Sequence, residues 1–351
     1  MEEHDAAGLF VNCTGIIGAE AFEKLRLPRD PILSSLQTIT FYSPSGRSFR
    51  YNPGKPLAFV VSRVRFDQAL VQLAAHEGAH FRYGYHARLI RVDQDAVEIR
   101  TREDDPEPIR AKTAVIATGF GSNLAAQVGL IGPTQIVYGA QAEVEMDNLR
   151  DVEIYLGKKI APNAFAWIVP LTEKKARIGL TVAKEAPVYF QHFLKNPAIA
   201  GRLHTKNPTM LLSPIPVCPM EPSSTDRVLV VGEAAGQVKT TTHGGIYYGM
   251  LCAVLAAQTL QDAFEKNNVE ASFLRRYDRR WLKIIGPELK TGGNLRQLFA
   301  NLSDAQIDAM VELGARDDII GVVRRLAHFD WHKKLIQSSL ELPALQKVTR
   351  A

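Results

Sequence analysis

The sequence predicts a mixed α/β protein in which a parallel-sheet layer is interrupted by an antiparallel β-sheet domain and followed by C-terminal helices. Two short apolar segments, 114–118 and 227–231, each precede a glycine, as strands buried on both faces of a parallel sheet do. Between them, segments of 138–182 alternate apolar and polar side chains, which indicates an antiparallel sheet. Residues 270–351 are more polar and have a helical pattern throughout.

The composition, 46% hydrophobic and 23% charged over 351 residues, is typical of a globular protein and excludes disordered, collagen-like and disulfide-scaffold classes. A net charge of +5 is small for this length and indicates no nucleic-acid partner. The most apolar run, 246–260, is shorter than the ~20 residues of a membrane span, and the acidic start lacks the apolar core of a signal peptide. We therefore expect a cytoplasmic protein with free thiols at Cys13, Cys218 and Cys252.

The first predicted helix covers 66–76, where Phe66, Leu70 and Leu73 recur at helical spacing. Gly78 ends this helix, and the alternating pattern of 80–102 predicts a hairpin. Residues 76–80 match the zinc motif HExxH, which requires both histidines on one helix face. Because Gly78 lies inside this match, we interpret the histidines as exposed residues at a helix end and predict no metal site.

The antiparallel domain is predicted from strands at 140–144, 153–156, 164–169 and 176–182. A proline-rich stretch, 208–222, then marks a crossing between domains. The second buried strand, 227–231, leads through a loop rich in glycine and threonine into an apolar helix from about Ile246. A Rossmann-like layer is the simplest assembly of these elements.

The strongest functional signal is the glycine-rich segment 231–236, followed by Gly244 and Gly245 directly before the helix at Ile246. Small residues allow a flat ligand to approach the backbone, and a helix start presents free N–H groups to an anion. The alternative interpretation is a tight strand–helix connection whose glycines serve packing alone. Two glycine clusters and a threonine run near one helix start favour ligand binding.

These residues closely resemble the second flavin-binding motif of the geranylgeranyl reductase family, whose FAD-dependent members are related in fold to para-hydroxybenzoate hydroxylase. The family's motif reads Gly-Asp-Ala-Ala-Gly, and Glu233 replaces its aspartate here with one more methylene. Other matches follow in the family's order along residues 2–300. The resemblance implies an FAD site formed by Glu2, Arg63, Gly119, Gly232, Glu233, Ala234, Gly236, Gly244, Gly245 and Ile246.

The same resemblance implies roles for two other segments. Cys13 lies where the family places a cysteine near the flavin ring, as a proton donor in one interpretation and as a buried apolar residue in the other. Phe165, Trp167 and Pro170 match the family's Tyr-x-Trp-x-Phe-Pro segment, which lines a prenyl pocket. Alternation along this strand predicts that Phe165, Trp167 and Val169 share one face.

The implied function is reduction of isoprenoid, geranylgeranyl-type C=C bonds by hydride transfer from reduced FAD, with NAD(P)H or ferredoxin as the electron donor. The alternatives are a flavin-dependent aromatic hydroxylase on the same fold and a non-catalytic fragment. The partner is a prenyl-chain small molecule or lipid. Arginines at 275, 276, 279 and 280 form a solvated basic face or a peripheral contact with an anionic membrane.

The family opens with a strand, a GxGxxG turn and a helix, and no GxGxxG occurs in this chain. We therefore expect an N-terminally truncated protein that binds FAD weakly. The expected FAD-binding domain comprises 1–37, 62–135 and 224–265. The expected substrate domain comprises 38–61 and 136–223, and the C-terminal helical region comprises 266–351.

Overall fold

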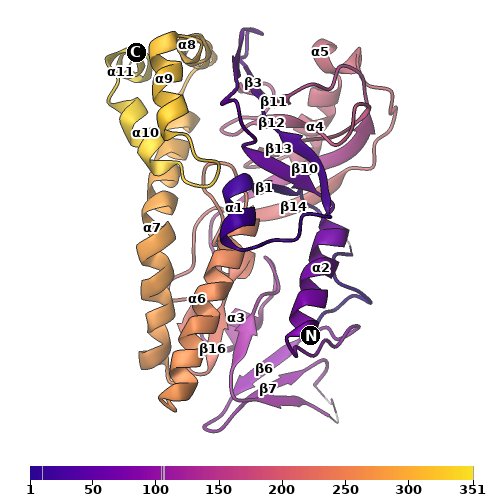
Figure 1. Ribbon diagram of the computed structural model, residues 1–351, viewed down its shortest axis with the longest axis vertical. Helices are drawn as coiled ribbons and strands as arrows, with labels where there is room; N and C mark the ends of the chain where they lie inside the picture. Colours follow the sequence, from indigo (N-terminus) through magenta and orange to yellow (C-terminus); the bar gives the residue numbers. More distant parts are fainter. Residues whose placement is uncertain (10, 104, 106, 351) are drawn as a thin grey trace. The chain divides into compact units, whose positions relative to one another are not determined.

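The computed structural model describes the whole chain except residues 10, 104, 106 and 351. It divides into two compact units, each built from several stretches of sequence (Figure 1). Unit 1 comprises Met1–Val11, Val64–Ile136 and Ile215–Lys290. Unit 2 comprises Asn12–Arg63, Val137–Pro214 and Thr291–Ala351. The predicted mixed α/β class is confirmed, because both units combine sheets with helices.

The central sheet of unit 1 has the strand order β15-β16-β9. Its strands are β9 (Ala114–Ile116), β15 (Ser224–Thr225) and β16 (Val228–Val230). Strand β16 pairs in parallel with β9, and Val230 lies opposite Ile116. All three residues of β16 are fully buried, which confirms the prediction of a strand covered on both faces. The carboxyl ends of β9 and β16 therefore meet at one edge of the sheet.

Strand β9 differs from its prediction on one face. Ala114 and Ile116 are buried, whereas the side chain of Val115 is 44% exposed. The prediction of burial on both faces is therefore wrong for this strand. The physical reason is that β9 is the outer strand of its sheet. A continuous apolar run cannot distinguish such a strand from a central one.

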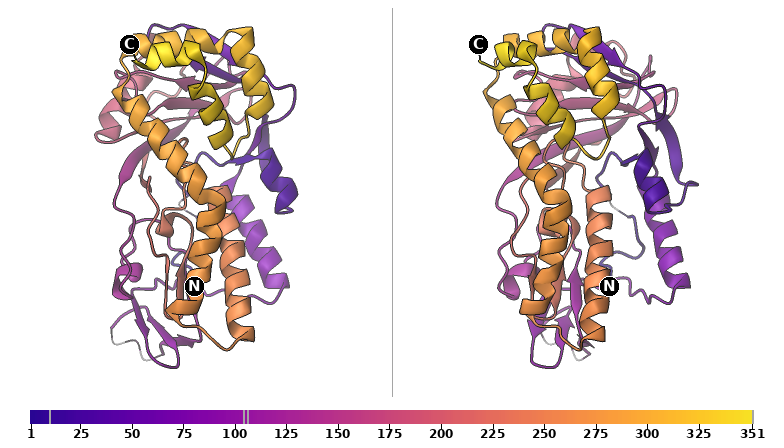
Figure 2. Two further views of the ribbon diagram at one scale, coloured as in Figure 1. Left: turned by 90° about the vertical axis from the view of Figure 1, so that its left-hand side faces the viewer. Right: turned by 60° about the vertical axis from the view of Figure 1, so that its left-hand side comes forward.

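The other elements of unit 1 follow the predicted order. The predicted hairpin is present as antiparallel β6 and β7, with β8 as a third strand. Helix α6 begins at Ile246 as expected and lies beside the first half of α7 (Figure 2). Helix α2 ends at His76, so His80 lies outside that helix. The bounds are α2 (Arg63–His76), β6 (Leu89–Val92), β7 (Val97–Arg100), β8 (Ile109–Ala111), α3 (Leu124–Gln127), α6 (Ile246–Glu265) and α7 (Ala271–Asn301).

Unit 2 is built on a seven-stranded sheet with the order β14-β10-β13-β12-β11-β3-β4. The predicted antiparallel sheet is confirmed by the pairing of β10 with β13, β13 with β12 and β12 with β11, whereas β11 pairs with β3 in parallel. Two prolines of the proline-rich stretch lie in β14, an outer strand, where a missing N–H is tolerated. The strands are β3 (Ile39–Tyr42), β4 (Ser48–Tyr51), β10 (Ile136–Glu145), β11 (Val152–Tyr155), β12 (Ala166–Pro170), β13 (Lys175–Val182) and β14 (Leu211–Pro216).

The two faces of this sheet carry separate cores. One face packs Ala166 and Ile168 against α4, and the other packs Trp167 and Val169 with residues of the small sheet β1-β5-β2. The predicted alternation along β12 is thus confirmed. The remaining elements are β1 (Ile16–Gly18), α1 (Ala19–Lys24), β2 (Ile32–Leu36), β5 (Ala58–Val61), α4 (Ala186–Leu194), α5 (Pro197–Ala200), α8 (Asp304–Gly314), α9 (Asp317–Leu326), α10 (Lys333–Leu340) and α11 (Pro343–Arg350). In the described part of the chain, no helix combines the length and apolar character that crossing a bilayer requires.

Candidate functional site

The first part of the candidate site lies at the carboxyl edge of the parallel pair β9 and β16 in unit 1. The backbone N–H of Val231 donates to the carbonyl of Ile116 at 3.0 Å, which extends the ladder to the ends of both strands. Gly119, which follows β9, has φ +70°, and a Cβ atom added there would meet nothing within 4 Å. Ligands of parallel sheets bind at this edge, so Gly119 lies beside space in which a ligand can bind.

The glycine turn, residues 232–237, follows β16 directly. It consists of the 3-10 turn η1 (Gly232–Ala235), then Gly236 and Gln237. Gly232 and Gly236 both have positive φ, +68° and +67°. A Cβ atom added to Gly236 would overlap the carbonyl oxygen of Cys218 and lie 2.9 Å from the Cα atom of Pro219. Only glycine fits at position 236 without moving the backbone.

Helix α6 begins next to this turn. Its N-cap is Gly245, which offers no capping side chain, and a Cβ atom there would lie 3.4 Å from Oε1 of Glu233. The carboxylate of Glu233 therefore lies beside the positive end of the helix dipole, where negative charge is stabilised. A Cβ atom added to Gly244 would lie 3.1 Å from Cε of Lys239. This helix start and the turn fit a flat cofactor that carries an anionic group.

Glu2 lies in unit 1 against the loop at 82–85 and not on a strand. Its N–H donates to the carbonyl of Arg82 at 2.8 Å, and its carbonyl accepts from the N–H of Tyr85 at 2.9 Å. The carboxylate of Glu2 accepts a hydrogen bond from the N–H of His4 at 3.0 Å and contacts the His4 ring at 2.7 Å. Glu2 is thus held by His4 and by the backbone of the loop at 82–85.

In unit 2, the segment around Cys13 is held by two strands of the large sheet. The hydroxyl of Thr14 donates to Oε1 of Gln141 at 2.6 Å, and Nη1 of Arg177 donates to the carbonyl of Thr14 at 2.7 Å. The N–H of Gly15 lies 3.3 Å from Sγ of Cys13. The side chain of Arg177 is 11% exposed and forms a 2.9 Å ion pair with Glu143. Strands β10 and β13 thereby fix the backbone that carries Cys13.

Gly15 brings Arg63 close to this segment. It has φ +73°, and a Cβ atom there would lie 2.7 Å from the carbonyl oxygen of Val61 and 2.9 Å from Nη1 of Arg177. The same Cβ atom would lie 3.6 Å from Cγ of Arg63, the first residue of α2. Of the predicted site residues, the structure therefore brings Arg63 and Cys13 into one neighbourhood within unit 2.

Phe165 and Trp167 lie together on the large sheet, with ring centroids 5.8 Å apart. The indole of Trp167 covers Gly179, its register partner on β13, where a Cβ atom would lie 2.5 Å from the ring. Nε1 of Trp167 is buried and makes no hydrogen bond to any described residue. Gly179 therefore makes room for an aromatic ring that lies flat on the sheet.

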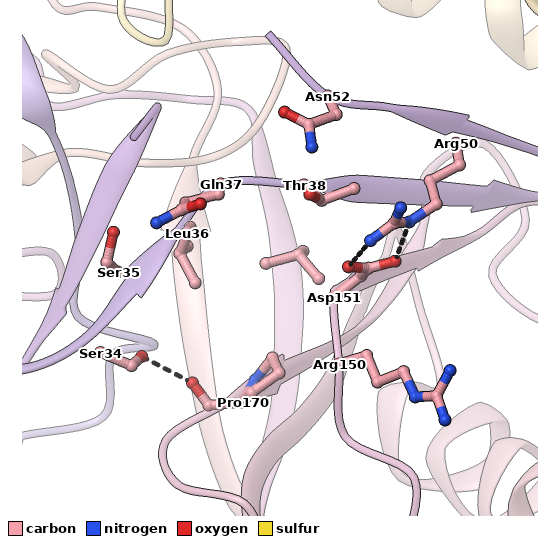
Figure 3. A pocket seen from close by; sticks show the side chains of 11 residues that line it. Ser34, Ser35, Leu36, Gln37, Thr38, Arg50, Asn52, Arg150, Asp151 and Pro170 are labelled. Carbon is pink, nitrogen blue, oxygen red and sulfur yellow. Dashed lines mark hydrogen bonds and ion pairs between the residues drawn. The ribbon is translucent and has the colours of Figure 1, made fainter. Parts of the chain in front are cut away.

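Pro170 lines a polar pocket of about 320 Å³ at one end of the same sheet (Figure 3). Its carbonyl accepts a hydrogen bond from the hydroxyl of Ser34 at 2.8 Å. Arg50 forms two hydrogen bonds with Asp151, at 2.6 and 2.8 Å, and these bonds, as the largest cause, lower the pKa of that carboxyl. Since neither Phe165 nor Trp167 lines this pocket and most of its lining is polar, it does not suit a prenyl chain.

Two pairs of polar residues support the site but were not among the site residues that the sequence predicts. Gln141 and Arg177 hold the Cys13 segment, and Gln237 and Tyr277 hold the glycine turn. Arg177 had a detectable signal, because it is the one charged side chain between Ala176 and Val182 in an otherwise apolar strand. Gln141 and Tyr277 had no signal for these roles, since Thr14 and Gln237, their partners, are distant in the sequence, and Gln237 directly follows the predicted glycine-rich segment.

The family model of the geranylgeranyl reductase catalytic domain matches residues 135–204, most of which lie in the large sheet and its helices. Over 326 residues, the chain is 30% identical to a digeranylgeranylglycerophospholipid reductase of Methanocaldococcus jannaschii. The match covers 89% of this chain and 83% of that relative.

Solved structures show the same fold. A geranylgeranyl bacteriochlorophyll reductase-like protein from Thermoplasma acidophilum superposes with a TM-score of 0.85 at 20% identity, over 99% of this chain and 90% of the other. A point mutant of the halogenase PltM, solved in complex with FAD, superposes with a TM-score of 0.61 at 15% identity, over 90% of this chain and 73% of the other. One scaffold therefore serves proteins of different chemistry.

Proposed function

This chain belongs to the geranylgeranyl reductase family, and from that premise we propose that it is an FAD-dependent oxidoreductase that reduces isoprenoid C=C bonds of the geranylgeranyl type. The observation that carries the proposal is the glycine turn at the carboxyl edge of β9 and β16, which leads to the start of α6, where the N-cap residue Gly245 has no side chain. A flat anionic cofactor is the ligand that such an edge suits best.

The residues proposed to hold FAD divide by what they offer. The glycines offer close backbone approach, and the start of α6 offers N–H groups and a positive dipole end. Glu233 offers a carboxylate that accepts hydrogen bonds from hydroxyl groups. Bound and reduced, FAD supplies the hydride for reduction of the alkene. The proposed set is Glu2, Arg63, Gly119, Gly232, Glu233, Ala234, Gly236, Gly244, Gly245 and Ile246.

We propose Cys13 as the group that gives a proton to the second alkene carbon. An isolated alkene is not polarised, so its reduction depends on the position of the proton donor. The hydrogen bonds from Arg177 to Thr14 and from Thr14 to Gln141 support this role, because they fix the residue that directly follows the thiol.

Phe165, Trp167 and Pro170 are the proposed substrate residues, with the aromatic pair as an apolar wall for the prenyl chain. We expect Trp167→Phe to leave the melting temperature nearly unchanged, because Phe keeps most of the ring and removes an N–H without an acceptor. The turnover rate should fall, or the enzyme should prefer a prenyl chain of another length, because the smaller ring leaves more room beside the substrate. Melting curves and product analysis with prenyl substrates of several lengths measure both effects.

Trp331→Phe is the matched control, since Trp331 is also in unit 2 but contacts Lys24, with the ammonium 5.9 Å from the ring centroid. It should leave the chain-length preference unchanged. If Trp167→Phe lowers stability markedly and leaves turnover per folded flavin intact, Trp167 belongs to the core and not to a substrate wall.

The proposed partners are a prenyl-chain lipid and an electron donor, NAD(P)H or ferredoxin. We propose a cytoplasmic enzyme that touches a membrane surface through the arginines at the start of α7. Arg275, Arg276 and Arg279 are exposed there, whereas Arg280 is bonded to Thr259 at 2.8 Å and to Asp262 at 2.5 Å. Binding to anionic vesicles that weakens with salt is the expected result.

The decisive experiment is a product assay on purified protein with added FAD and a chemical reductant. The proposal expects a saturated prenyl chain formed without oxygen and a flavin absorption band in the protein. Oxygen-dependent hydroxylation of an aromatic ring, with no reduction of prenyl substrates, would instead identify a hydroxylase. A protein without flavin absorption at saturating FAD would contradict both assignments.

A further inference from the structure

A pair of hydrogen bonds closes the glycine turn at its two ends. The N–H of Gly232 donates to the side-chain Oε1 of Gln237 at 2.8 Å. In the opposite direction, the backbone N–H of Gln237 donates to the carbonyl of Gly232 at 3.0 Å. Gln237 is fully buried, so both bonds are shielded from water. The same two residues therefore fix the start and the end of the turn.

Helix α7 supplies the second support. Nε2 of Gln237 donates to the hydroxyl of Tyr277 at 2.8 Å, and that hydroxyl donates to the carbonyl of Val230 at 3.0 Å. Tyr277 is also fully buried, and burial raises its pKa, so the hydroxyl keeps its proton. Its one proton goes to Val230, so it can only accept from Gln237. A single orientation of the amide satisfies Gly232 and Tyr277 together.

We propose that Gln237 and Tyr277 are positioning residues for FAD, which hold the glycine turn in the conformation that receives the cofactor. The inference rests on the proposed function. Two glycines with positive φ give residues 232–236 many alternative conformations. A turn that is ordered before binding loses less conformational entropy when the ligand arrives, and therefore binds more tightly.

The same helix offers a matched control. Nε1 of Trp281 donates to the hydroxyl of Ser223 at 2.9 Å, and that hydroxyl donates to Asp278 at 2.6 Å. Ser223 is as buried as Tyr277, and the hydrogen bonds of its hydroxyl go to Trp281 and Asp278 and not to the glycine turn. Its carbonyl accepts from the N–H of Val230 at 2.9 Å, a backbone bond that Ser223→Ala keeps. Each substitution therefore removes one buried hydroxyl from the contact between α7 and the segment 223–237. Ser223→Ala does so before β16, and Tyr277→Phe does so at the glycine turn.

The test compares Tyr277→Phe with Ser223→Ala. Both should lower the melting temperature of the FAD-free protein, because each leaves buried polar groups unpaired. Titration with FAD, followed by its fluorescence quenching, should give a Kd at least about tenfold higher for Tyr277→Phe, the effect of roughly one lost hydrogen bond to a turn. Ser223→Ala should leave the Kd within about twofold of the wild type. Equal weakening in both variants, or none in Tyr277→Phe, overturns the proposal.

A second readout does not need the cofactor. Hydrogen exchange of the FAD-free protein, followed on a peptide that covers 231–238, should be faster in Tyr277→Phe and unchanged in Ser223→Ala. Gln237→Met keeps the length of the side chain and loses the two hydrogen bonds of its amide, to Gly232 and to Tyr277. It should repeat the result of Tyr277→Phe. If the wild type shows no FAD binding, the proposed function fails. Hydrogen exchange alone then tests whether Gln237 and Tyr277 order the glycine turn. Unchanged exchange at 231–238 in Tyr277→Phe and Gln237→Met then overturns the inference.

Discussion

Gly236→Ala is expected to unfold unit 1 under conditions in which the wild type is stable. The added Cβ atom would overlap the carbonyl oxygen of Cys218 and approach the carbonyl carbon to 3.0 Å. Both obstacles are backbone atoms, which cannot rotate away as a side chain does. The residue would also hold φ +67°, which is unfavourable for alanine. We expect a loss of about 4 kcal/mol or more in the free energy of unfolding, measured by urea denaturation.

Gly232→Ala separates the two causes. Gly232 has nearly the same φ, +68°, but a Cβ atom there would have only the Cα atom of Gly249 nearby, at 4.0 Å. The variant should therefore lose only the conformational term, about 1–2 kcal/mol. Equal losses at the two positions would show that backbone conformation alone, and not the contact with Cys218, requires glycine at 236.

Arg202→Met is expected to destabilise unit 2 by about 3–5 kcal/mol, because it leaves a buried carboxylate without its cation. Arg202 donates to both carboxylate oxygens of Glu153, at 2.7 and 2.9 Å, and Glu153 is 5% exposed. Arg202 also donates to the carbonyls of Asp147 and Asn148, at 3.1 and 3.0 Å. Circular dichroism during urea unfolding gives the loss.

Two comparisons identify the origin of this loss. Arg47→Met removes an ion pair with Glu312 in which both side chains are about half exposed, so it should cost at most about 1 kcal/mol. Adding Glu153→Gln to Arg202→Met removes the unpaired charge and keeps an acceptor for the hydroxyl of Tyr155, which lies 2.5 Å from Glu153. This double variant should recover about half of the lost stability. No recovery would mean that lost packing, and not the isolated charge, causes the defect.

The sequence predicts those parts of the fold that depend on local patterns. The apolar run of β16, the hairpin of β6 and β7 and the alternation around Trp167 all appear where the periodicity places them. The exposure of Val115 could not be predicted, because periodicity reports the strand and not the layers that pack on it. Position within the sheet decides that exposure.

The residues of the candidate site also differ in whether the sequence reveals them. Gly232 and Gly236 are visible in the sequence because their positive φ values exclude most other residues. Gly244 and Gly245 are visible as a pair directly before the helix, where an added Cβ atom would lie 3.1 and 3.3 Å from its nearest neighbour. Gln237 and its partner Tyr277 are 40 residues apart, and Arg177 and Thr14 are 163 apart. Such contacts follow from tertiary packing, which leaves no local pattern for a single sequence to reveal.

The distribution of the three tryptophans has a practical consequence for optical measurements. Trp281 is the one tryptophan of unit 1, fully buried, while Trp167 and Trp331 both belong to unit 2. A chain carrying Trp167→Phe and Trp331→Phe would therefore emit from unit 1 alone, and its red shift on unfolding would follow that unit. The Trp281→Phe chain would report unit 2. Intrinsic fluorescence can thus assign each unfolding transition to its own unit without an attached dye.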